Sequence, residues 1–140
     1  MKADFYYLTR TPLDRALPAI AERVLASGAR LAIVADDAEM LGHLDQHLWL
    51  YRPDSFLPHG QTGDQPVLLC RADAVPAGYA NIAYVDGLWR DPASGTARVF
   101  YFFTGDALDQ ARAAWRALAT TDVERRYWKQ DEAGRWVEGP

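Results

Sequence analysis

The chain has 140 residues, of which 49% are hydrophobic and 24% charged, and its formal net charge is −4. These values are typical of one compact globular domain, here residues 1–140. Only Lys2 and Lys129 are lysines among the fifteen basic residues, and this acidic balance argues against a protein that grips nucleic acid mainly through its phosphates.

The first third of the chain alternates strand and helix signals. Residues 5–8 predict a buried strand, and Thr11-Pro12 predicts a helix start, with Thr11 as cap and Pro12 in the first turn. Gly28 suits the end of this helix, and residues 31–35 are a continuous apolar run, typical of a strand covered on both faces. The helix carries an apolar stripe at helical spacing, formed by Leu13, Leu17, Ile20 and Val24.

A second helix follows Asp36-Asp37, which supplies its cap, and buries a stripe formed by Leu41, Leu44 and Leu48. Residues 51–64 hold two prolines and two glycines and predict a loop. Three further strands are expected at residues 66–70, 80–85 and 99–103, the last of them central in the sheet.

The last third predicts a helix and a hairpin. Asp106 is the expected cap of a third helix, residues 106–119, with Asp109 favouring the helix dipole three residues later. Residues 127–137 have aromatic ends around a turn, which predicts a terminal hairpin. The order of elements predicts an α/β fold: a three-layer domain with a mostly parallel central sheet flanked by helices, Rossmann-like but without a phosphate-binding loop.

The segment that would bind nucleotide phosphates in such a fold is the first strand-to-helix turn. Here it reads Thr9-Arg10-Thr11-Pro12, without the glycines that let backbone amides surround phosphates. A small nucleotide- or phosphoryl-processing enzyme therefore stays only as an alternative, suggested by the fold pattern alone.

No catalytic or metal centre stands out. His43 and His47 lie four residues apart but away from the buried stripe, and a solvated helix face explains them better than a metal site. His59 is interpreted as an ordinary loop histidine, and Cys70 as a small buried residue. We therefore expect no cofactor and no metal.

The absence of a signal sequence and of a long apolar run predicts a cytoplasmic protein without a membrane partner. The single cysteine, Cys70, cannot form an internal disulfide and fits a reducing compartment. We expect a monomer when the chain is isolated.

Two segments carry more aromatic and cationic character than packing requires. Trp49 and Phe56 lie at and after the end of the second helix, and either build an exposed apolar wall or cover the open end of the core. On the third helix, Trp115 lies beside Arg112 and Arg116, which are four residues apart. The alternatives there are a solvated face and a site for a partner ending in an aromatic residue and a carboxylate.

The order of residues in the first of these segments resembles the DNA polymerase III chi subunit family. A leucine–aspartate pair (Leu44-Asp45) and Trp49 precede a run of serine, phenylalanine, an apolar residue, proline and histidine, residues 55–59. The aromatic opening at residues 5–8 and the ending at residues 127–136 are similar too. The resemblance covers nearly the whole chain.

This resemblance implies a non-catalytic adaptor in DNA replication. Chi proteins bind the acidic C-terminal tail of single-stranded-DNA-binding protein, which ends in proline and phenylalanine, and many bind the psi subunit, which connects them to the clamp loader. Carried over by position, the implied tail-binding residues are Trp49, Phe56, Arg112, Trp115 and Arg116. A third hypothesis, direct binding of single-stranded DNA through Trp49, Phe56 and Trp115, conflicts with the acidic balance.

Overall fold

The structure is a computed structural model that describes residues 1–51 and 57–139. The helices are α1 (Leu13–Ala26), α2 (Ala38–Leu50) and α3 (Leu108–Leu118), with 3₁₀ turns η1 (Ala72–Ala74) and η2 (Gly105–Ala107). The strands, in chain order, are β1 (Lys2–Tyr7), β2 (Leu31–Val34), β3 (His59–Gly60), β4 (Val67–Cys70), β5 (Asn81–Tyr84), β6 (Arg98–Phe103), β7 (Glu124–Gln130) and β8 (Trp136–Glu138).

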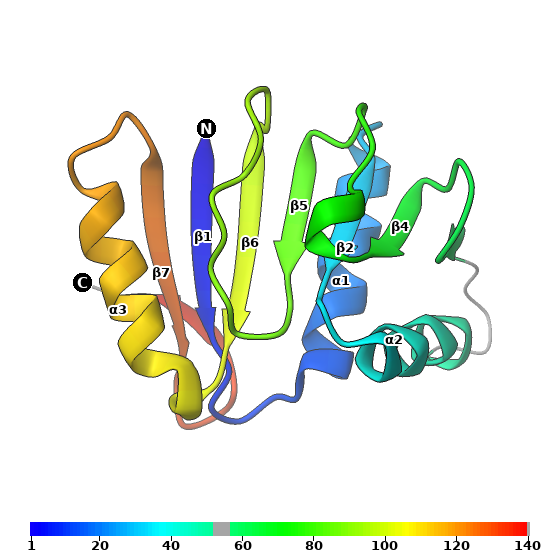
Figure 1. Cartoon of the computed structure of the whole chain (residues 1–140). Helices are drawn as coiled ribbons and strands as arrows, with labels where there is room; N and C mark the ends of the chain where they lie inside the picture. Colours follow the sequence, from blue (N-terminus) through cyan, green and yellow to red (C-terminus); the bar gives the residue numbers. More distant parts are fainter. Residues whose placement is uncertain (52–56, 140) are drawn as a thin grey trace.

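The strands form one sheet in the order β3-β4-β2-β5-β6-β1-β7-β8. All neighbouring pairs are parallel except β7 and β8, which pair antiparallel. The predicted mostly parallel sheet is thus confirmed, with β6 inside it and the expected hairpin at its end (Figure 1).

The direction of each crossover decides which face of the sheet each helix covers. Parallel crossovers are right-handed, so crossovers that run opposite ways along a sheet place their helices on opposite faces. The β1–α1–β2 and β2–α2–β4 connections run one way, and β6–α3–β7 runs the other. Accordingly α1 and α2 pack on one face, α3 packs on the opposite face, and the predicted three layers are confirmed (Figure 1).

The starts of two helices differ from the sequence predictions. The N-cap of α1 is Pro12 rather than Thr11, because the Thr11 hydroxyl is committed to accepting a hydrogen bond from the Gln130 side chain. Asp106 does not cap α3, because the chain first makes the η2 turn, and its carboxylate accepts from the Thr104 hydroxyl instead.

Other local predictions are confirmed. The Asp37 carboxylate accepts from the backbone N–H of Glu39 at 2.9 Å and caps α2. Gly28 follows α1 with a φ of 82°, in the left-handed region that suits glycine. Within the predicted loop, however, the chain forms β3 beside β4. None of the described helices is long and apolar enough to cross a bilayer.

Candidate functional site

The predicted site residues fall at two separate places. Trp49 lies in the last turn of α2 and packs on His59 of the edge strand β3, with ring centroids 4.4 Å apart. Trp115 lies on α3 and packs edge-on against Phe5 of β1 at 5.2 Å. Four strands, β4, β2, β5 and β6, separate β3 from β1, and the helices lie on opposite faces.

The structure therefore does not bring Trp49 together with the residues predicted on α3. The reason is the opposite direction of the crossovers, which carries α2 and α3 to different faces. Trp49 remains 48% exposed at its own end of the molecule. Phe56 and Arg52 lie outside the described residues.

The three predicted residues on α3 do come together, around a hollow that we call the α3 pocket. Its volume is about 250 Å³, and aromatic rings from β1, β6 and β7 make up most of its floor. Sequence reasoning missed these floor residues, although the period of two in a strand would have placed Phe5 and Tyr7 on the same face of the first strand. The pocket is lined by Phe5, Tyr7, Phe103, Leu108, Ala111, Arg112, Trp115, Arg116 and Tyr127.

Trp115 forms one wall of the α3 pocket and is held from several directions. Its indole is half-buried, edge-on to Phe5 and inclined at 73° to the ring of Tyr127, with centroids 6.3 Å apart. The buried residues of α3 are Ala111, Ala114 and Leu118. Trp115 therefore sits at the edge of the packed stripe, where part of the ring stays accessible.

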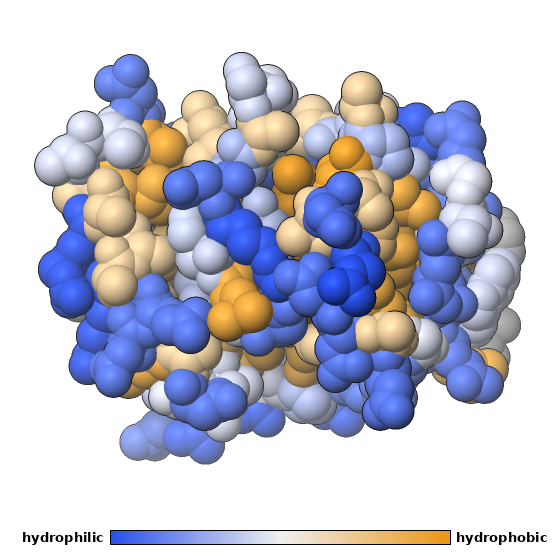
Figure 2. Space-filling view, in the orientation of Figure 1, coloured by the Kyte–Doolittle hydropathy of each residue, from blue (hydrophilic) through white to orange (hydrophobic). Residues whose placement is uncertain are grey.

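Positive charge borders this apolar wall. Arg112 and Arg116 are exposed and lie one helical turn apart, and neither forms an ion pair within residues 1–51 and 57–139. Burial raises the pKa of Tyr127, the nearby Tyr7 adds to the rise, and the charge of Arg112 opposes it. Hydrophilic residues gather along the outer side of α3 (Figure 2, left). The α3 pocket can thus hold one apolar ring beside an anionic group.

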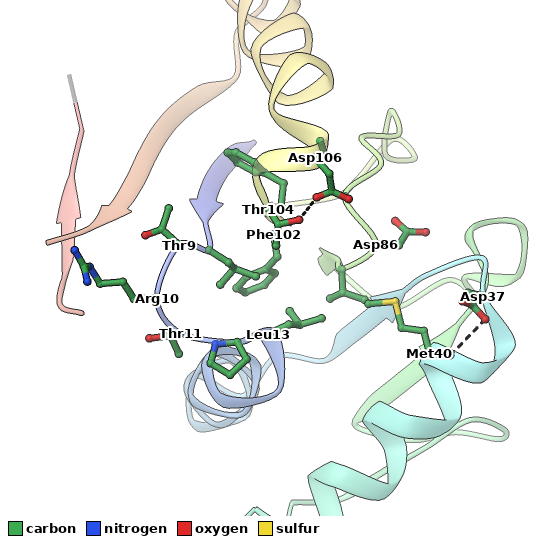
Figure 3. Close-up of a pocket in the computed structure, with 16 residues that line it drawn as sticks. Thr9, Arg10, Thr11, Leu13, Asp37, Met40, Asp86, Phe102, Thr104 and Asp106 are labelled. Atoms are coloured by element: carbon green, nitrogen blue, oxygen red, sulfur yellow. Dashed lines mark hydrogen bonds between the residues drawn. The ribbon is translucent and has the colours of Figure 1, made fainter. Parts of the chain in front are cut away.

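A larger hollow of about 700 Å³ lies at the carboxyl ends of β1, β5 and β6, where ligands bind in many open α/β sheets (Figure 3). Three carboxylates, Asp37, Asp86 and Asp106, come from segments that border it, and the side chain of Arg10 points away from it (Figure 3). Asp86 is paired with Arg90, but the negative charges of Asp37 and Asp106 disfavour a phosphate here. The hollow gives no support to the nucleotide-enzyme alternative.

The first strand-to-helix turn is also closed to phosphates by a side chain from the terminal hairpin. The Gln130 side-chain oxygen accepts from three successive backbone N–H groups, those of Thr9 (3.3 Å), Arg10 (2.9 Å) and Thr11 (3.0 Å). Successive amides of this kind make an anion-binding nest in nucleotide-binding proteins. In this chain the Gln130 carbonyl fills the nest.

The histidines and the cysteine belong to the packing. His59 is not an ordinary loop residue: it is 4% exposed, and its ring nitrogens lie 2.6 Å from the Leu57 carbonyl and 2.8 Å from the Asp45 carbonyl. Burial raises the pKa of Cys70 to about 11, so its thiol stays protonated at neutral pH. Across the described part of the chain, no three His, Cys, Asp or Glu side chains are grouped to hold a metal ion.

The sequence matches one known protein family. The family model described as DNA polymerase III chi subunit, HolC, matches residues 1–126. A comparison with curated proteins gives no significant match. The match covers most of the chain. The chain therefore belongs to the DNA polymerase III chi subunit family, whose members are non-catalytic accessory subunits of the replicative holoenzyme.

Proposed function

We propose that this protein is a cytoplasmic adaptor that binds the acidic C-terminal tail of single-stranded-DNA-binding protein in its α3 pocket. It links that protein to the clamp loader, through a psi subunit where the bacterium has one. The observation that carries the proposal is the combination in one hollow of an aromatic floor and two guanidinium groups without ion pairs among the described residues. Membership of the chi family supports it.

In the proposed complex the terminal phenylalanine of the tail enters the α3 pocket. Its ring packs between Trp115 and the floor, and its carboxylate meets Arg116, while acidic residues of the tail approach Arg112. A guanidinium gives a carboxylate two parallel hydrogen bonds and keeps its charge at any physiological pH. The α3 pocket thus suits both the aromatic ring and the terminal carboxylate of the last tail residue.

The size of the α3 pocket sets the expected affinity. It holds one side chain, and contacts of this kind contribute about 1 to 3 kcal/mol each. A handful of them corresponds to micromolar binding, roughly 8 kcal/mol. Because Arg112 and Arg116 are exposed, their contribution is screened by salt. Weak, reversible attachment suits an adaptor that passes between moving partners.

Trp49 lies outside this site, and the proposal gives it no contact with the tail. The same separation argues against direct binding of single-stranded DNA, because a stacking track needs its aromatic residues along one groove. Trp49 lies on α2 beside the edge strand β3, whereas Trp115 lies on α3, which covers the opposite face of the sheet.

The test is a titration of the protein with a fluorescently labelled acidic tail peptide, with a second peptide lacking the final phenylalanine. We expect micromolar binding of the first and at least a tenfold loss with the second. Arg116→Glu should weaken binding at least tenfold. Arg126→Glu reverses a charge on the opposite face of β7, where Arg126 lies 3.8 Å from Glu124 and 3.9 Å from Glu138, and it should leave binding within about twofold. Equal effects of the two substitutions, or no binding at low salt, would overturn the proposal.

A further inference from the structure

Arg125, which precedes the pocket residue Tyr127 by two positions on β7, contacts Trp115 in two ways. Its guanidinium carbon lies 4.2 Å from the centre of the indole ring, a cation–π arrangement. One of its nitrogens also donates a hydrogen bond to the Trp115 backbone carbonyl. Arg125 does not itself line the α3 pocket, so any effect it has on a ligand there acts through Trp115.

The backbone contact has a clear cause in the way α3 ends. The N–H of Ala119 donates to the Arg116 carbonyl at 3.1 Å, one residue later than regular α-helical pairing would require. This leaves the Trp115 carbonyl for a partner outside the helix. Arg125 supplies that partner, and its positive charge also suits the negative end of the helix dipole.

Two aromatic rings also contact the indole: Phe5 and Tyr127 are both edge-to-face to it, at ring-centre distances of 5.2 and 6.3 Å. Contacts at the edge of a flat ring restrict its rotation about the side-chain bonds less than a group lying over its face does. Arg125 is the charged group over that face. Arg125 therefore contacts both the indole ring and the backbone carbonyl of Trp115.

We infer that Arg125 is a positioning residue that holds Trp115 in the orientation needed to receive the terminal aromatic ring of the tail. This inference rests on the proposed function. Arg125 therefore sets how strongly the α3 pocket prefers an aromatic last residue, beyond its general attraction for acids. Without Arg125 the Trp115 indole must become ordered when the tail binds. This ordering lowers the affinity for a tail that ends in an aromatic residue, but not for one that ends in alanine. We expect a loss of about five- to tenfold.

The test compares two acidic peptides, one ending in phenylalanine and one in alanine, across three variants. Arg125→Gln should weaken binding of the phenylalanine peptide about five- to tenfold and reduce the ratio between the two peptides. Arg126→Gln removes the same charge one residue away on the opposite face of β7, and should change both peptides equally. Arg125→Lys keeps the charge without the planar stack, so it should leave binding of the alanine peptide unchanged and still reduce the ratio between the two peptides. An unchanged ratio in Arg125→Gln would overturn the inference.

A second readout separates this inference from the proposed function. The order of the Trp115 indole N–H, measured by its nitrogen-15 heteronuclear NOE in the protein without peptide, should fall in Arg125→Gln and stay unchanged in Arg126→Gln. If the parent protein binds neither peptide, the proposed function fails, and an unchanged indole NOE in Arg125→Gln would refute the positioning role as well. A lowered NOE in that case would retain the positioning of Trp115 and reject only the tail as its ligand.

Discussion

Replacing the half-buried Gln130 should destabilise the protein clearly more than replacing its exposed neighbour Lys129 on β7. Its side-chain oxygen accepts from the N–H groups of Thr9, Arg10 and Thr11, and its amide donates to the Thr11 hydroxyl at 2.6 Å and to the Gly134 carbonyl at 2.9 Å. Each bond contributes about 1 kcal/mol net, and water replaces part of the loss because the turn is partly exposed. We expect Gln130→Ala to lower the free energy of unfolding by about 2 kcal/mol.

Urea unfolding followed by tryptophan fluorescence measures this change, and a thermal melt should show a fall in Tm of roughly 6 to 8 °C. Gln130→Met keeps the length of the side chain but removes its polar atoms, so it should cost about as much as Gln130→Ala. The matched control is Lys129→Ala, next on the strand, whose side chain forms no hydrogen bond or ion pair within the described residues. A loss for Gln130→Ala within about 0.5 kcal/mol of that control would refute the reasoning.

Three further outcomes are expected. Trp49→Ala should leave binding of the tail peptide within about twofold of the parent in the same titration, since Trp49 lies on the other face from the α3 pocket; a loss as large as that of Trp115→Ala would contradict this. Burial tends to raise the pKa of the Asp86 carboxyl, but hydrogen bonds from Arg90 and from two backbone amides hold this pKa below its usual value of 3.8. The stabilisation that these bonds give the folded protein is therefore present above pH 3.8 and is lost as the pH falls through the lower pKa of the folded state. The loss of unfolding free energy in Arg90→Met should therefore shrink when urea melts are moved from neutral pH to below 3.8, and an undiminished loss would exclude this pairing as its source. Cys70, whose pKa is raised to about 11 by burial, should resist maleimide at neutral pH until urea unfolds the chain, whereas rapid labelling of the native protein would show that the thiol is accessible.

Local patterns predicted the parts of the fold that depend on neighbours in sequence. The stripe of α1, the apolar run of β2 and the Asp37 cap arise from side chains within a few residues of one another. The grouping of Arg112, Trp115 and Arg116 was predictable for the same reason, since residues three and four apart share a helix face.

What the sequence did not reveal depends on strand order. The resemblance implied that Trp49 and Trp115 both bind the tail, but a single sequence does not state the strand order, which decides on which face of the sheet each helix packs. Gln130 reaches a turn some 120 residues earlier in the chain, and no local signal marks such a contact. Arg125 is similar, because its partner Trp115 belongs to another element on the far side of a turn.

The position of β1 inside the sheet has a consequence for how the protein is made. Phe5 lies opposite Tyr101 on one side and Tyr127 on the other, so both neighbours of β1 are synthesised long after it. At about 5 to 20 residues per second, the nascent strand waits on the order of 10 s for its last partner. During that interval an apolar, aromatic segment has unpaired backbone on both edges, which is a template for aggregation. Synthesis that stops after α3 would leave β1 as a permanent open edge, so truncated chains should be captured by chaperones or aggregate rather than fold.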